Sequence, residues 1–151
     1  MPTFRDIPYS AFNFLVELEA GQGSEVLAGF SEVSGLSAEV TVAEYRVGNS
    51  LNNYVTKIPG IHKSGDITFK RGVTGSENIW QWLKEARAGS MTSKRDVTVK
   101  LMSENRDSVV VTWVLRGAIP IKWTGPTLAA KGGGDVAMEE LVLSIENIEE
   151  S

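Results

Sequence analysis

Apolar and polar residues alternate along several short segments of this chain, and that period of two constrains the fold more than any other feature of the sequence. Successive residues of an extended chain point to opposite faces, so an alternating segment has one apolar and one polar face. In the first such segment every second residue from position 12 to position 18 is apolar, namely Phe12, Phe14, Val16 and Leu18. This pattern is typical of a half-buried strand in an antiparallel sheet.

Six further segments are predicted to be strands. They cover residues 26–33, 36–42, 66–70, 96–101, 109–115 and 136–148. Residues 109–115 are nearly all apolar, which is typical of a strand covered on both faces, and the polar turn at 104–107 joins them to the preceding strand as a hairpin. In the last segment the apolar row consists of Leu141, Leu143 and Ile145. These segments together indicate a mainly β protein.

One segment has a helical period instead. Thr74 and Glu77 have the spacing of a capping box, and Gly89 stands where a helix C-terminal cap is expected, so we predict a helix over residues 76–88. The residues expected to pack this helix on the sheet are Ile79, Trp80 and Leu83. Among the tryptophans, Trp80 and Trp113 are predicted to be core residues because they lie in apolar rows, whereas Trp82 and Trp123 are candidates for a protein interface.

The chain has the length and composition of one globular domain, 1–151. It contains 42% hydrophobic and 23% charged residues, and 151 residues suffice to bury a sizeable core without metal or disulfide. The net charge of -4 argues against a general affinity for phosphate backbones. We expect a small β-barrel or sandwich with one flanking helix. Because the N-terminus has no leader-like apolar region and no apolar run could span a membrane, we expect the chain to fold in the cytoplasm.

Two stretches differ from the rest. Residues 44–63 carry several glycines and asparagines with scattered apolar side chains, and they are predicted to form a long structureless loop that reaches beyond the domain. Residues 124–135 include the run Gly132–Gly134 and are predicted to form a mobile surface loop. No Lys-Ser/Thr pair follows that glycine run, so we interpret it as a connector and not as a phosphate-binding loop.

The sequence offers little for catalysis. It has no cysteine and a single histidine, His62, which excludes thiolate chemistry and provides no second histidine for a metal site. The pairs Glu139-Glu140 and Glu149-Glu150 are interpreted as solvated charge, since neighbours in a strand point to opposite faces and the second pair lies at the terminus. We therefore predict no catalytic residue, no metal site, no cofactor and no enzymatic activity.

Several motifs, in one order along the whole chain, resemble the tail-tube family of contractile phages and phage-tail-like extracellular injection systems. They are Pro8–Phe14, Phe30–Leu36, Glu44–Arg46, Lys57–Gly60, Gly65–Gly72 and the helix with Trp80 and Trp82. The succession of the Ser-Gly-Leu and Lys-Arg-Gly blocks is the most specific part of this resemblance.

The resemblance implies a small β-barrel with a flanking helix, six copies of which form a ring, with rings stacked into a hollow tube inside a sheath. The implied partners are further copies of the chain, a sheath protein, baseplate or tube-initiator and terminator proteins, and cargo or DNA in the lumen. Assembly is then expected in the bacterial cytoplasm, within a phage tail or an injection particle. The residues expected to face the lumen are Glu39, Thr41, Asp66, Thr68 and Lys70.

In that assembly the long loop is expected to lie against the next ring and set its register. Its expected anchors are Tyr45, Leu51, Tyr54, Val55, Ile58 and Ile61. Two alternatives stay open at this point. A type VI secretion ring protein has a related fold and also forms hexamers, and a monomeric ligand-binding barrel would remain small at every concentration.

Overall fold

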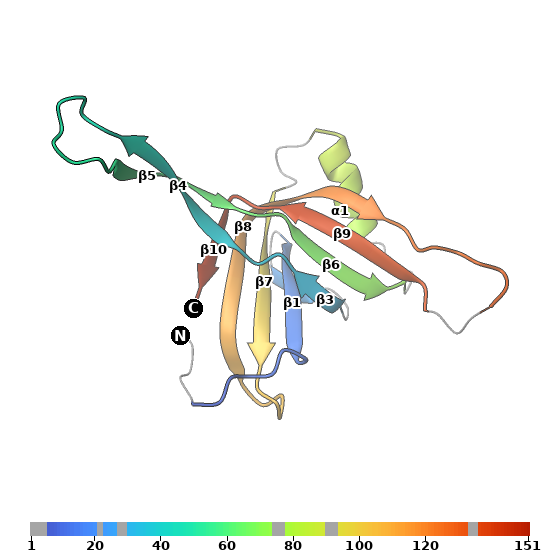
Figure 1. The fold of residues 1–151 in the computed structure, drawn as a ribbon. Coiled ribbons are helices and arrows are strands. Elements are labelled where there is room, and N and C mark those ends of the chain that lie inside the picture. The colour runs from blue at the N-terminus through green and yellow to red at the C-terminus, as the bar shows by residue number, and fades with distance from the viewer. Residues whose placement is uncertain (1–5, 21–22, 27–29, 74–77, 90–93, 133–135) are drawn as a thin grey trace.

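The computed structural model describes residues 6–20, 23–26, 30–73, 78–89, 94–132 and 136–151. Within these ranges it contains ten strands and one helix, shown in Figure 1. The strands are β1 (Phe14–Ala20), β2 (Gly23–Val26), β3 (Phe30–Ser34), β4 (Ala38–Tyr45), β5 (Thr56–Ser64), β6 (Ile67–Gly72), β7 (Arg95–Met102), β8 (Val109–Thr124), β9 (Met138–Ser144) and β10 (Asn147–Glu150), and the helix is α1 (Asn78–Arg87). The prediction of a mainly β protein with one flanking helix is confirmed.

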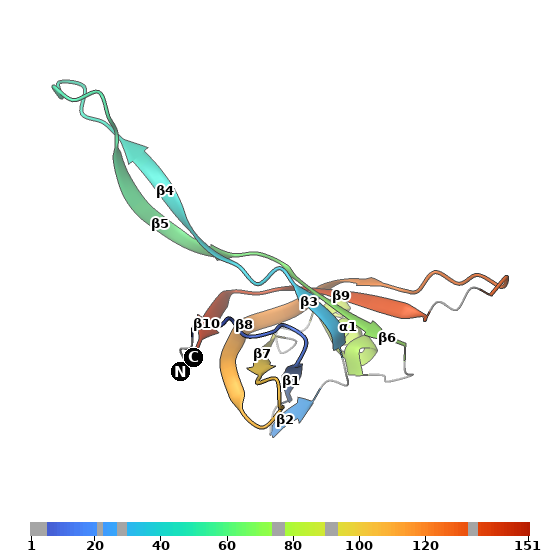
Figure 2. The same ribbon diagram turned by 60° about the horizontal axis from the view of Figure 1, so that its bottom comes forward.

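Eight strands form one antiparallel sheet in the order β2-β1-β7-β8-β9-β6-β3, with β10 paired to β8 beside this path, while β4 and β5 form a separate two-stranded sheet. The strand β8 joins the two halves of the large sheet. Its residues up to Ala118 pair with β7, and its residues from Ile119 onward pair with β9. Figure 2 shows the strong curvature of β8 that folds one half of the sheet over the other.

The change of partner along β8 coincides with Gly117. This residue has φ 65°, a left-handed conformation that L side chains rarely adopt, and its N–H donates to Asp96 Oδ1 at 3.2 Å. The register between β7 and β8 shifts at the same place, between Arg95 and Val97. A bulge of this kind bends a strand, which explains how one strand serves both halves of the sheet.

A single hydrophobic core lies between the two halves of the sheet. Each half contributes its alternate residues, and the helix adds two more. The buried residues are Val16, Val97, Val99, Leu115 and Ala118 from the first half and its junction, Ile67, Phe69, Leu141, Leu143 and Ile145 from the second, and Ile79 and Trp82 from α1. In β6 the burial alternates strictly, as its sequence predicts.

The helix α1 ends as predicted but uses another tryptophan for packing. Gly89 has φ 77° and its N–H donates to the Ala86 carbonyl at 3.1 Å, as expected of a glycine that caps a helix C-terminus. The predicted capping box at 74 and 77 falls outside the described residues. Trp82 is fully buried, while Trp80 is 39% exposed, so the expectation of a core Trp80 and an interface Trp82 is wrong. The reason is that Trp82, three residues after the buried Ile79, shares its face of the helix.

Several predicted strand boundaries differ from the structure. The segment 26–33 contains the end of β2 and most of β3, separated by residues outside the described ranges, and β8 continues nine residues beyond the predicted end at 115. The segment 136–148 is divided between β9 and β10, because the N–H of Glu146 turns to donate to the Arg116 carbonyl at 2.9 Å. In the part of the chain that the structure describes, α1 is too short and too polar to span a membrane.

Candidate assembly surfaces

The strands β4 and β5 form an arm that projects from the body of the molecule, as Figures 1 and 2 show from two sides. We define the arm as residues 38–64. The predicted structureless loop over 44–63 is therefore wrong, because residues 56–64 form β5 and pair with β4. Pro59 lies opposite Val42 at a register shift, an irregularity at which a strand tolerates the missing N–H of proline.

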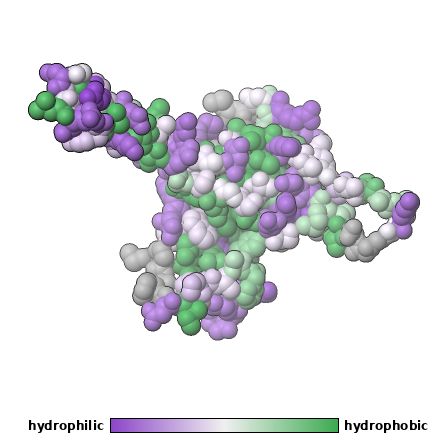
Figure 3. Space-filling model, in the orientation of Figure 1, coloured by the Kyte–Doolittle hydropathy of each residue, from purple (hydrophilic) through white to green (hydrophobic). Residues whose placement is uncertain are grey.

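The arm exposes apolar side chains that the body does not cover. Figure 3 shows apolar and polar residues mixed along it up to its tip. The predicted anchors Tyr45, Leu51, Tyr54, Ile58 and Ile61 are all exposed, Leu51 completely and Tyr54 to 70%, whereas Val55 is half-buried. Several large apolar side chains exposed on one projecting element are typical of protein interaction sites.

The tip of the arm is held by its own hydrogen bonds. The guanidinium of Arg46 donates to the Asn52 carbonyl through Nε at 3.3 Å and Nη2 at 3.2 Å. The side-chain amide of Asn52 donates in turn to the Tyr54 hydroxyl at 3.1 Å, and its backbone N–H donates to Ser50 Oγ at 3.3 Å. Leu51 is thus presented on an ordered tip, which lowers the entropy cost of binding through it.

The half of the sheet formed by β3, β6, β9 and the end of β8 has one polar face. Lys70 lies opposite Glu32 on β3 and Glu140 on β9, and its Nζ is 3.5 Å from Glu32 Oε2. Thr68, two residues earlier, lies opposite Ser34 and Val142 on the same face. The residues that alternate with them, Ile67, Phe69 and Arg71, are buried on the other face. Two of the five predicted lumen residues, Thr68 and Lys70, thus share one polar surface.

The other three predicted lumen residues lie outside β6. Glu39 and Thr41 belong to β4, which pairs only with β5 among the described strands, and Asp66 precedes β6. Within one subunit the strand that carries Glu39 and Thr41 and the strand that carries Thr68 and Lys70 therefore belong to different sheets, and that these residues face a lumen stays a prediction. The physical reason is that β4 leaves the large sheet after β3 to form the arm.

Beneath the polar face lies a buried ion pair that the sequence analysis missed. The side chain of Arg71 is 2% exposed and that of Glu139 is 12% exposed. Arg71 Nε donates to Glu139 Oε1 at 2.5 Å, and Trp123 Nε1 donates to Glu139 Oε2 at 3.1 Å. The interpretation of Glu139 as solvated charge is wrong. The alternation in the sequence could have indicated that Arg71 is buried, because Arg71 continues the buried row of Ile67 and Phe69.

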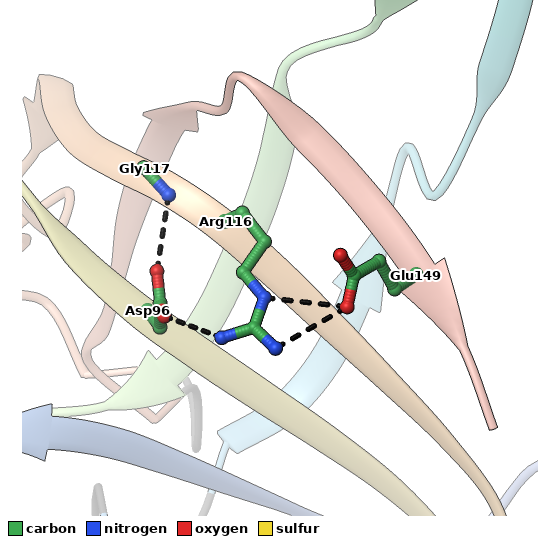
Figure 4. A network of polar contacts seen from close by, with 4 residues as sticks. All are labelled: Asp96, Arg116, Gly117 and Glu149. Carbon is green, nitrogen blue, oxygen red and sulfur yellow. Dashed lines mark hydrogen bonds and ion pairs between the residues drawn. The ribbon is translucent and has the colours of Figure 1, made fainter.

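A second polar network fastens β10 to β8 (Figure 4). Arg116 donates to Glu149 Oε2 from Nε at 3.3 Å and from Nη2 at 3.2 Å, and to Asp96 Oδ2 at 2.7 Å. Hydrogen bonding to Asp96, and then to Glu149, raises the pKa of Arg116 above its usual value. The C-terminal segment is a paired strand, and Ser151 exchanges two backbone hydrogen bonds with Thr112. Glu149, interpreted as solvated charge at the terminus, is therefore held in a strand and bonded to Arg116.

An open groove of about 650 Å³ separates α1 from the end of β8. Trp80, Leu83, Ile121 and Trp123 are among its lining residues, and the rings of Trp80 and Trp123 meet edge to face at 5.2 Å between centroids. Trp123, predicted as an interface candidate, is half-buried, with its indole N–H used by Glu139.

The described residues bring no catalytic constellation together. His62 is exposed on β5, in the arm, opposite Val40. No group of three histidine, cysteine, aspartate or glutamate residues within the described ranges is arranged to hold a metal ion. The arrangement instead consists of surfaces: an apolar arm, a polar sheet face and an apolar groove beside the helix.

Solved structures with the same architecture belong to injection particles. A chain of the extended sheath-tube complex of PVC, an extracellular contractile injection system, is 26% identical, with TM-score 0.80, over 97% of this chain and 93% of that one. A chain of the anti-feeding prophage baseplate, 6-fold symmetrised, is 23% identical with TM-score 0.81 over 97% of both chains, and shows the same fold. Hcp1 from Flavobacterium johnsoniae shares the fold less closely, with TM-score 0.51 and 14% identity over 91% of this chain and 94% of that one.

No curated protein matches the sequence significantly. The sequence does match the family described as T4-like virus tail tube protein gp19, over residues 10–149. The match includes every strand from β1 to β9, most of β10, the helix and the whole arm. The chain is a member of the T4-like virus tail tube protein family.

Proposed function

We propose that this protein is the inner-tube subunit of a contractile injection apparatus or contractile phage tail. The observation that carries the proposal is the projecting apolar arm on a subunit of the tail-tube family. Exposed apolar side chains on an ordered arm are unfavourable in an isolated protein and useful in a polymer, where the next copy buries them.

Six copies form each ring in this proposal. The described part of the large sheet ends at β2 on one side and β3 on the other, and unpaired edges of this kind invite pairing with another chain. Head-to-tail contacts between copies close into a ring when the rotation permits. A relative's structure is 6-fold symmetrised, which supports six copies per ring.

The arm stacks the rings, with Tyr45, Leu51, Tyr54, Ile58 and Ile61 as its anchors. The polar face around Thr68 and Lys70 lines the lumen, and Glu39, Thr41 and Asp66 join it where copies meet. Along this wall Lys70 lies between two carboxylate residues of neighbouring strands, so charges of both signs stand side by side. A wall of mixed charge favours passage of cargo or DNA over its adhesion.

The remaining partners follow from the particles in which similar chains occur. Those structures are a sheath-tube complex, a sheath/tube terminator and a baseplate, so we propose a sheath protein, a terminator and a baseplate initiator as partners of this chain. The function is mechanical: sheath contraction drives a rigid tube through the target membrane. The subunit itself performs no covalent chemistry.

Electron microscopy of the purified protein tests the proposal. We expect sixfold rings or stacked tubes, alone or after addition of a tail initiator, and a sedimentation coefficient that rises with concentration. A protein that stays monomeric at high concentration with the initiator present would contradict the proposal. A type VI ring protein is the second candidate, supported by the fold of Hcp1, and secretion of unsheathed rings into the medium would favour it.

A further inference from the structure

The groove between α1 and β8 is unusual in its charge. Arg87 and Lys94 are among its lining residues, and no carboxylate is among the described residues that line it. Lys122 also borders it, but Lys122 lies opposite Val142 and therefore belongs to the polar face of the sheet. The whole chain has a net charge of -4, so the groove differs in sign from the protein around it. Its floor is apolar and aromatic, with Trp80 and Trp123 in contact.

Two cations of α1, Arg87 in the lining of the groove and Lys84 three residues before it, differ from the other cations nearby. Lys94 pairs with Glu146 at 2.5 Å, and Arg95 pairs with Glu85 at 2.9 Å. For Lys84 and Arg87, by contrast, the described residues contain no ion-pair partner, and both are exposed on the last turn of α1. Cations in a last turn also favour the helix dipole, but that effect does not account for the apolar groove next to them.

The register of the strands shows which way the groove faces. Trp123 lies opposite Leu141, which lies opposite Phe69, so Trp123 belongs to the buried face of the sheet. Lys70 belongs to the other, polar face. Because the Trp80 ring meets Trp123, the helix lies across the sheet from Lys70. If the polar face lines the lumen, the groove opens toward the outside of the tube.

We propose that this groove binds an acidic segment of the sheath subunit that carries an apolar anchor side chain. The inference rests on the proposed function, which places a sheath around the tube. Apolar contact with Trp80 and Ile121 supplies area, as aromatic pockets do at binding hot spots, and the unpaired Lys84 and Arg87 select negative charge. A neutral or basic sheath segment would leave these cations unpaired.

Binding of the purified sheath subunit of the same particle to preassembled tubes tests this inference. The variant K84E/R87E should form tubes like the wild type and bind sheath roughly tenfold less tightly in co-sedimentation, because two attractive charges become repulsive. The matched control K131E reverses one exposed cation in the connection between β8 and β9 and should bind normally. In the wild type, binding should weaken as salt is raised.

A second variant keeps the helix charges and changes the apolar wall. Ile121 is half-exposed, so I121S should leave the subunit folded by far-UV circular dichroism and weaken sheath binding several-fold. Normal sheath binding by both K84E/R87E and I121S tubes would overturn the inference while leaving the tube function intact. Loss of tubes in these variants would overturn it as well, because the groove would then be a contact between copies of this chain. Failure of the wild type to form tubes would refute the proposed function instead.

Discussion

Replacing Leu51 by serine separates the role of the arm in assembly from its role in folding. Leu51 is fully exposed at the tip, so the substitution removes no buried contact from the subunit. Complete burial of one leucine side chain against another ring would contribute about 1.5–3 kcal/mol. With six copies per ring, that amounts to roughly 9–18 kcal/mol for each ring junction before any compensation by neighbouring contacts.

The expected result is a subunit with an unchanged thermal unfolding midpoint that forms few or no long tubes. Differential scanning calorimetry at a concentration below assembly gives the first quantity, and the length distribution in negative-stain micrographs gives the second. The control L128S changes a leucine that is 82% exposed in the connection between β8 and β9 and should polymerise normally. Tubes of normal length from L51S, or equal loss in L128S, would refute the assignment of ring stacking to the arm.

Three further predictions concern the subunit. Trp82→Ala should lower the free energy of unfolding by about 3–5 kcal/mol, whereas Trp80→Ala should cost clearly less, because only Trp82 is fully buried; equal losses in urea titrations would contradict the packing described. Arg71→Ala should lower the free energy of unfolding by about 3–5 kcal/mol, because Glu139 would stay buried without its cation. The double variant R71M/E139L should recover much of that loss in the same titration. No recovery would show that the loss does not come from the broken ion pair. Gly117→Ala should lower the free energy of unfolding by about 1–2 kcal/mol, because φ is +65° and the new Cβ would meet the Glu146 carboxylate. A Tm equal to that of the wild type would refute this prediction.

The strands and the helix follow from local periodicity, which explains why they were predictable. The row Ile67, Phe69, Arg71 alternates in the sequence and is buried in the structure. Tryptophan placement was less predictable, since Ile79 is compatible with a helical face that continues through Trp82 or through Leu83. Only the contact with a particular strand decides between them, and that contact depends on where β8 bends.

The second strand of the arm, β5, was not predicted, although the segment was expected to reach beyond the domain. Both of its faces are exposed in the subunit, so no alternation between a wet and a dry face marks β5, and Gly60 and Pro59 resemble loop residues. Residues such as Leu51 are exposed in one subunit, and in the proposed assembly the surface that buries them belongs to another copy. A segment whose apolar residues fit neither a core nor a loop therefore indicates an intermolecular contact. For this chain, that argument supports the proposal, made from its family membership, that the arm stacks one ring on the next.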